Sequence, residues 1–288
     1  MTVIFKKLKS YASLTILFFS IPILLFGFIS ILFAHGSIPP ASVLVWIFVA
    51  LLATRLGGNA FNRIADRDFD KKNPRTKDRD IPAGRVKLFE AYILTILFFA
   101  LLLVAAYNLN TLCLILSPLA IGLSILYSYT KRFTWLCHFV LGFVFGGAPV
   151  GVWIAITGSI DVLPFVLGCA IMFFVAAGDI INSIQDRQFD SENKLHSIPA
   201  KFGQKKALFT AVFSQVIFFA MLAVLPYFAE NLSWFYYIGL AVILLLLIVE
   251  HILIDPANEK KMIFIVFGVN NIIIIILFTF VCIDYFIL

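Results

Sequence analysis

The sequence predicts an all-α, polytopic membrane protein with about nine transmembrane helices in a bundle. Of its 288 residues, 62% are hydrophobic and only 13% are charged, and the mean hydropathy is +1.02. Soluble domains have about half apolar and about a quarter charged residues, so an ordinary soluble domain is excluded. A helix needs about 20 apolar residues to cross a bilayer, and a chain of this length with short loops holds about nine such helices.

Apolar windows of about 19 residues, separated by polar residues or by Pro and Gly, predict the individual helices. Lipid forces the backbone to complete its hydrogen bonds within each segment, and barrel strands would be shorter and alternating, so helices are predicted. The apolar run after Lys6, Lys7 and Lys9 is too long for a signal peptide and is expected to stay as the first span. We expect a single transmembrane domain over 1–288, with helices near 12–34, 42–62, 91–109, 111–129, 134–157, 161–183, 206–228, 232–253 and 262–286.

Positive charge lies on one side of the predicted bundle. Every lysine and arginine except Arg55 falls in the N-terminal tail or in the connections 63–90, 130–133, 184–206 and 254–261. By the positive-inside rule the N-terminus is cytoplasmic and the C-terminus lies on the opposite side. The net charge of +6 is therefore assigned to membrane orientation, and nucleic-acid binding is excluded.

Cysteine and histidine indicate no metal site. The cysteines are isolated in apolar stretches without a C-x-x-C pair, so neither disulfides nor zinc are expected. The histidines have no metal-ligand spacing, and we assign them no catalytic role. These residues are Cys113, Cys137, Cys169, Cys282, His35, His138, His196 and His251.

The two long cytoplasmic loops carry the same motif. Residues 62–73 and 182–193 agree at seven positions with a constant offset of 120, and each copy is followed by an Ile-Pro-Ala tripeptide. An internal parallel repeat is the natural interpretation. A single Asp-x-x-x-Asp beside a membrane is usually a solvated, salt-bridged loop. Its repetition favours a functional site on the cytoplasmic face.

The repeated motif has the chemistry of a magnesium site. Asn62, Asp66 and Asp70 are spaced i, i+4 and i+8, so a continuing helix would present their oxygens on one face. Asp186 and Asp190 repeat the pair. Carboxylates without sulfur or imidazole favour Mg²⁺, which is usually held by one or two carboxylates together with substrate phosphates. The flanking cations, among them Arg75, Lys77, Arg79 and Arg85, would neutralise phosphate charge.

Further polar residues lie near this face. Asp179 lies inside a predicted span, where an ionisable group indicates function unless it is hydrated at the interface. Arg55 forms a polar stripe with Asn59 and the first motif, and either belongs to the site or pairs with an acid such as Asp179. Lys131 follows the fourth span, where it either binds a diphosphate or reflects the positive-inside rule.

Together these residues resemble the UbiA-type intramembrane aromatic prenyltransferases over nearly the whole chain. The first signature is carried by Asn62, Asp66 and Asp70 with the stretches 73–76 and 81–84. The second is carried by Asp179, Asp186 and Asp190 with the stretch 196–203. Tyr127, Lys131 and Arg132 are similar to the pattern that follows the fourth helix. The sequence looks closest to the 4-hydroxybenzoate polyprenyltransferase branch.

The resemblance implies a bundle around a central cavity, Mg²⁺ with an allylic polyprenyl diphosphate at the aspartates, and transfer of the chain to an aromatic acid such as 4-hydroxybenzoate in ubiquinone or menaquinone biosynthesis. We also expect an integral protein of the bacterial inner membrane, and the sequence shows no evident obligate protein partner. We expect Asp66, Asp70, Asp186 and Asp190, with Asn62, to hold the metal, and Asp179 to support them. The remaining candidates are Arg75, Lys77, Arg79, Lys131 and Tyr127 for the diphosphate and Arg55 for the acceptor.

Three alternatives stay open at this point. The acceptor of a related enzyme would be a dihydroxynaphthoate, haem or a chlorophyll-type ring. A phosphatidyl-alcohol transferase is disfavoured because its D-G-x-x-A-R start is absent. From another class, a transporter would also carry parallel repeats and intramembrane charges, although transporter sites usually lie near the midplane rather than at one face.

Overall fold

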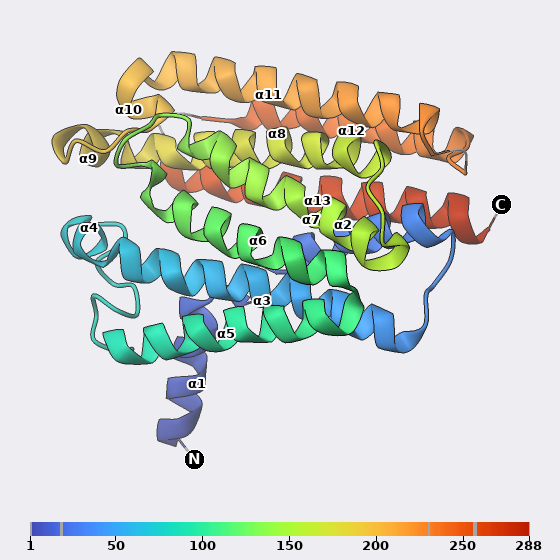
Figure 1. Ribbon diagram of the computed structural model, residues 1–288. Helices are drawn as coiled ribbons and strands as arrows, with labels where there is room; N and C mark the ends of the chain where they lie inside the picture. Colours follow the sequence, from blue (N-terminus) through green and yellow to red (C-terminus); the bar gives the residue numbers. More distant parts are fainter. Residues whose placement is uncertain (1, 18–19, 230, 256–257, 288) are drawn as a thin grey trace. The chain divides into compact units, whose positions relative to one another are not determined.

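The computed structural model describes residues 2–17, 20–229, 231–255 and 258–287, and every regular element in these ranges is a helix (Figure 1). Eight stretches in this part of the chain are long and apolar enough to cross a membrane. The prediction of an all-α, polytopic membrane protein is therefore confirmed. The main helices of these stretches are α3 (Ala41–Ala65), α5 (Leu88–Leu109), α6 (Thr111–Thr130), α7 (Cys137–Thr157), α8 (Leu163–Ser183), α11 (Gln204–Val224), α12 (Trp234–Leu253) and α13 (Glu259–Phe286).

The predicted first span, 12–34, is not one helix. It is divided into α1 (Thr2–Leu14) and α2 (Ile21–His35), and Ile16 between them has a φ of 56°. That left-handed conformation is unfavourable for a β-branched residue and interrupts the helix. The 15 residues of α2 extend about 22 Å, less than the hydrocarbon thickness of about 30 Å. Where about nine spans were expected, the described residues hold eight of full length, with α2 as a shorter apolar helix.

The chain forms two compact units. Unit 1 comprises Met1–Leu24 and Pro40–Tyr129, and unit 2 comprises Leu25–Pro39 and Thr130–Leu288. In unit 1 a small apolar cluster around Ala60 and Ile64 packs the C-terminal half of α3 against α5 and the loop before it. In unit 2 a larger cluster joins α2, α8, α11, α12 and α13, with the rings of Phe174 and Phe218 4.6 Å apart at its centre.

Helices α7 and α8 of unit 2 approach each other through backbone contacts. A Cβ atom added to Gly142 would lie 2.1 Å from the carbonyl oxygen of Met172, and one added to Gly146 would lie 2.4 Å from that of Gly168. Only glycine permits such an approach. The two contacts fix an antiparallel register, and this register brings His138, one helical turn before Gly142, to the end of α8 that carries Asp179.

Candidate active site

Both motifs have the same local backbone. The long helix ends just before the first aspartate in unit 1, where Asp66 has φ −91° and ψ 2°. In unit 2, Asp186 ends a 3₁₀ turn (η2, Ile184–Asp186) with φ −90° and ψ 0°. A six-residue helix follows in each case, α4 (Arg67–Lys72) and α9 (Arg187–Glu192). The second aspartate, Asp70 or Asp190, lies inside that short helix and is buried.

The helical hydrogen bonds continue through the bend in the first motif. The N–H of Asp66 donates to the carbonyl of Asn62 at 2.9 Å, and the N–H of Asp70 donates to that of Asp66 at 2.8 Å. The side-chain amide of Asn62 donates to Oδ2 of Asp66 at 3.1 Å. The expected uninterrupted helix is thus replaced by two helices that join at Asp66, while the predicted i, i+4 contacts between these three residues are kept.

Asp70 is held by a cation from the following loop. Its side chain is 7% exposed, and Nη1 of Arg79 lies 2.6 Å from its Oδ1. The hydroxyl of Thr76 donates to the Asp70 carbonyl at 3.2 Å and fastens the loop to α4. Oδ2 of Asp70 is buried and has no hydrogen-bond partner among the described residues. A buried oxygen of this kind is costly to leave unpaired and is suited to a ligand.

The other predicted residues of unit 1 differ in their surroundings. Lys77 and Arg75 are exposed on the loop after α4. Arg55 lies seven residues before Asn62 in α3, about two turns from the motif, and its Nε donates to the hydroxyl of Ser20 at 3.2 Å. Tyr127, in α6, lies within electrostatic reach of Arg63, as do both aspartates of the first motif. The motif spacing does not indicate Arg63, because this residue stands between motif positions.

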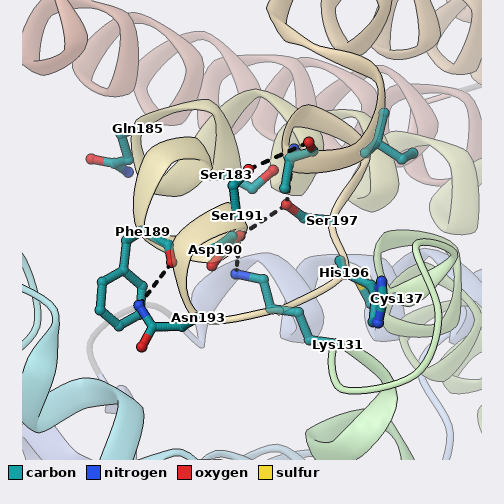
Figure 2. A network of polar contacts seen from close by, with 12 residues as sticks. Lys131, Cys137, Ser183, Gln185, Phe189, Asp190, Ser191, Asn193, His196 and Ser197 are labelled. Carbon is teal, nitrogen blue, oxygen red and sulfur yellow. Dashed lines mark hydrogen bonds and ion pairs between the residues drawn. The ribbon is translucent and has the colours of Figure 1, made fainter.

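In the second motif, Asp190 is held by two donors. Nζ of Lys131 and the hydroxyl of Ser197 both lie 2.8 Å from its Oδ2, and its side chain is 1% exposed. Figure 2 shows Asp190 between these two residues. Burial lowers the pKa of Lys131, but the charge of Asp190 and its hydrogen bond raise it more, so the pKa lies above its ordinary value. The ammonium group therefore stays charged.

Asp179 pairs with a histidine. Nδ1 of His138 lies 2.6 Å from Oδ2 of Asp179, and the imidazole is 1% exposed while the carboxylate is 29% exposed. The spacing of the histidines gave no reason to assign them a catalytic role, and it does not indicate that His138 is the partner of this candidate residue. No local sequence pattern indicates this contact, because the two residues are 41 positions apart and come together through the register of α7 on α8.

A sequence comparison decides the family. The model of the "UbiA prenyltransferase family" matches residues 21–272, which is most of the chain. The chain belongs to the UbiA prenyltransferase family. The family resemblance expected from the motifs is confirmed, and the protein is a prenyltransferase similar to 4-hydroxybenzoate polyprenyltransferases rather than a transporter.

Comparisons with individual UbiA relatives support this family assignment. A 4-hydroxybenzoate octaprenyltransferase of Francisella tularensis subsp. tularensis is 29% identical over 98% of both chains. One of Actinobacillus pleuropneumoniae serotype 5b is 32% identical over 72% of this chain and 70% of its own. The apo structure of a UbiA homologue from Aeropyrum pernix K1 matches with a TM-score of 0.81 and 30% identity, covering 92% of this chain and 97% of that one. A UbiA homologue from Archaeoglobus fulgidus, whose structure was solved with DMAPP and Mg²⁺, matches with a TM-score of 0.71 and 16% identity over 95% and 99% of the chains, and shows the same fold.

The residues of both UbiA motifs fit Mg²⁺. Among the described residues, no three His, Cys, Asp or Glu side chains gather as a ready metal site. Each motif instead offers a pair of carboxylates, and Mg²⁺ usually takes one or two carboxylates and completes its coordination with water and phosphate. The unpartnered Oδ2 of Asp70 is an oxygen donor of the required kind.

Proposed function

We propose that this prenyltransferase transfers a polyprenyl chain from an allylic polyprenyl diphosphate to an aromatic acid such as 4-hydroxybenzoate, with Mg²⁺, in quinone biosynthesis. The observation that carries the proposal is the 29% identity, over 98% of both chains, to a relative named for that acceptor and that reaction class. The carboxylate pairs of the two motifs support it, because they match the ligands that a magnesium diphosphate requires.

The proposed roles follow the contacts of each aspartate. Asp66, Asp70, Asp186 and Asp190 would hold the metal, with the amide oxygen of Asn62 as a further donor. Bound Mg²⁺ would supply positive charge that stabilises the departing diphosphate. Because Asp70 and Asp190 are each nearly buried, the fixed dipoles and charges around them act in a medium of low dielectric constant, where they are stronger than in water.

Two cations are already at the motifs. Arg79 is bonded to Asp70, and Lys131 is bonded to Asp190. In the absence of metal each cation balances a buried carboxylate that would otherwise be costly. We propose that both cations donate to the diphosphate of the substrate, together with Arg75 and Lys77. Tyr127 is proposed as a further diphosphate contact.

Arg55 lies deeper in α3 than the motif and would orient the carboxylate of the aromatic acid. An allylic cation is destroyed by water, so the walls of apolar helices would protect it. The distribution of lysine and arginine supports a cytoplasmic N-terminus and motif loops on the cytoplasmic side of a bacterial inner membrane.

The test is prenyl transfer by membranes that contain this protein. A polyprenyl diphosphate is offered with 4-hydroxybenzoate or with a dihydroxynaphthoate, with Mg²⁺ present or chelated. We expect prenylated 4-hydroxybenzoate that disappears on chelation. Prenylated dihydroxynaphthoate alone would assign the menaquinone acceptor, and intact diphosphate with every acceptor would overturn the proposal.

Two variants test the motif residues. Asp66→Asn and Asp186→Asn should each lower the rate by about 100-fold or more, because the charge that faces the diphosphate complex is lost. Asp68→Asn is the matched control: Asp68 lies in α4, two residues after Asp66, but its side chain is 76% exposed, and its ion pair is with the neighbouring Arg67, at 3.5 Å. Full activity in Asp66→Asn, or equal losses in all three variants, would contradict the assignment.

A further inference from the structure

The hydrogen bonds of His138 define its tautomer. The backbone N–H of Ile198 donates to Nε2 of His138 at 3.3 Å. A nitrogen that accepts from an N–H cannot itself carry a proton, so the proton of the neutral ring is on Nδ1. The Nδ1–H therefore donates to Oδ2 of Asp179 at 2.6 Å. The imidazole therefore accepts a hydrogen bond from the backbone of Ile198 and donates one to the carboxylate of Asp179.

The segment Leu195–Ile198 reaches both acids of the second motif. Its Ser197 hydroxyl donates to Asp190, and its Ile198 N–H reaches Asp179 through His138. The segment is tied down at two more points, where the N–H of Leu195 donates to the Asp190 carbonyl at 2.8 Å and that of His196 donates to the Lys131 carbonyl at 2.6 Å. Figure 2 shows how this segment passes beside Lys131 and Asp190.

One carboxylate oxygen of Asp179 is hydrogen-bonded, while part of the side chain is exposed. Its Oδ2 is bonded to a histidine that is almost completely buried, whereas the carboxylate as a whole is 29% exposed. Its Oδ1 has no hydrogen-bond partner within the described residues. A carboxylate whose one oxygen is fixed presents the other in a single orientation, and such support is typical of groups that act on a ligand.

We propose that His138 is a positioning residue for prenyl transfer: its Nδ1–H holds the Asp179 carboxylate so that Oδ1 faces the substrate, and its Nε2 couples that orientation to the segment which holds Asp190. The inference rests on the proposed function, because the ligand of Asp179 is the substrate of that reaction. His138 touches no reacting atom and acts only through Asp179.

Two amide variants separate the two bonds of the imidazole. The side-chain amide of His138→Asn reaches about as far as Nδ1 and can donate to Asp179, while that of His138→Gln reaches about as far as Nε2 and can accept from Ile198. We expect His138→Phe and His138→Gln to lose about 10- to 100-fold in kcat with a small change in KM, and His138→Asn to recover most of the rate. A rate that is recovered by Gln and not by Asn would overturn the proposal.

A double-mutant cycle tests whether His138 acts through Asp179. In the Asp179→Ala background, His138→Phe should change kcat by less than about twofold, because the group that it positions is gone. Losses that multiply would mean that His138 acts by general packing and would overturn the proposal.

The tautomer provides a readout that needs no activity. In ¹⁵N-histidine-labelled protein in lipid, the ring signals that vanish in His138→Phe should report a protonated Nδ1 and a bare Nε2. A bare Nδ1, or two protonated nitrogens, would overturn the inference even if the enzyme is active. Wild-type membranes that transfer no prenyl group would instead refute the proposed function and leave the tautomer result standing.

Discussion

The glycine contact between α7 and α8 allows two neighbouring substitutions to be compared. Gly146→Ala adds a methyl group 2.4 Å from the Gly168 carbonyl oxygen, whereas one added to Gly147 meets nothing within 4 Å. The two variants have the same chemical change, in the same helix, at consecutive positions. They differ only in whether the new carbon faces α8, so Gly147→Ala is the matched control.

The expected magnitude follows from the distance. A carbon at 2.4 Å is about 1 Å closer than the beginning of ordinary van der Waals contact, and the obstacle is backbone that cannot rotate away. Overpacking of this kind costs about 1–3 kcal/mol. Parting the helices by about 1 Å would also stretch the bond between His138 and Asp179 beyond hydrogen-bond range, and a bond to a charged group contributes about 1.5–3 kcal/mol. We expect Gly146→Ala to lose about 3–5 kcal/mol, and Gly147→Ala to change stability by less than about 1 kcal/mol, in the stabilising direction.

Thermal unfolding of the purified protein in detergent, followed by tryptophan fluorescence, measures the difference. Gly146→Ala should unfold at a clearly lower temperature than wild type and lose prenyl transfer, while Gly147→Ala should match or exceed wild type in both. If Gly146→Ala unfolds at the wild-type temperature, or if both variants fall equally, the proposed backbone contact does not set the register of these helices.

Two further predictions concern the cations at the motifs. Without metal, Arg79→Met should lower the unfolding temperature, because breaking a buried ion pair costs about 3–5 kcal/mol. Added Mg²⁺ should raise the unfolding temperature of the variant more than that of wild type, since the metal replaces the missing positive charge at Asp70. Equal increases in the two proteins would contradict this prediction. Lys131→Met should lose about 2–4 kcal/mol, less than a fully buried pair because Lys131 is about one-third exposed. Because the pKa of Lys131 is raised in the folded protein, its contribution to stability is complete below its unfolded-state pKa of about 10.4 and is lost only as the pH rises through its folded-state pKa. The difference in the free energy of unfolding between variant and wild type should therefore be constant from about pH 6 to 9. A difference that shrinks within that range would contradict the ion pair.

The membrane helices were largely predictable from the sequence, because hydrocarbon selects for uninterrupted apolar segments and hydropathy measures that property directly. The predicted span 42–62 became α3, which ends three residues later, at Ala65. Hydropathy does not report backbone conformation, however. The left-handed Ile16, which divides the first predicted span, lies within a run that is apolar on both sides.

In the candidate site, contacts between neighbours on one helix were predictable from the sequence, but pairing between different elements was not. Spacing along the helix predicted the contact between Asn62 and Asp66, since i and i+4 residues are neighbours in any helix. The partners of Asp179 and Asp190 come from other elements, and nothing in a local pattern indicates them. His138 meets Asp179 because α7 packs on α8 in one register, and Lys131, in the connection before α7, meets Asp190 in α9.

The second motif and its supports come from one uninterrupted stretch of the chain. Lys131, His138, Asp179, Asp190 and Ser197 lie between positions 131 and 198, and α7 and α8 are joined by the short connection 158–162. Contacts of small sequence separation form early and rapidly. During synthesis, the helical hairpin of α7 and α8 can therefore pair in the bilayer while α11, α12 and α13 are still unmade, so that the contact between His138 and Asp179 forms before unit 2 is complete.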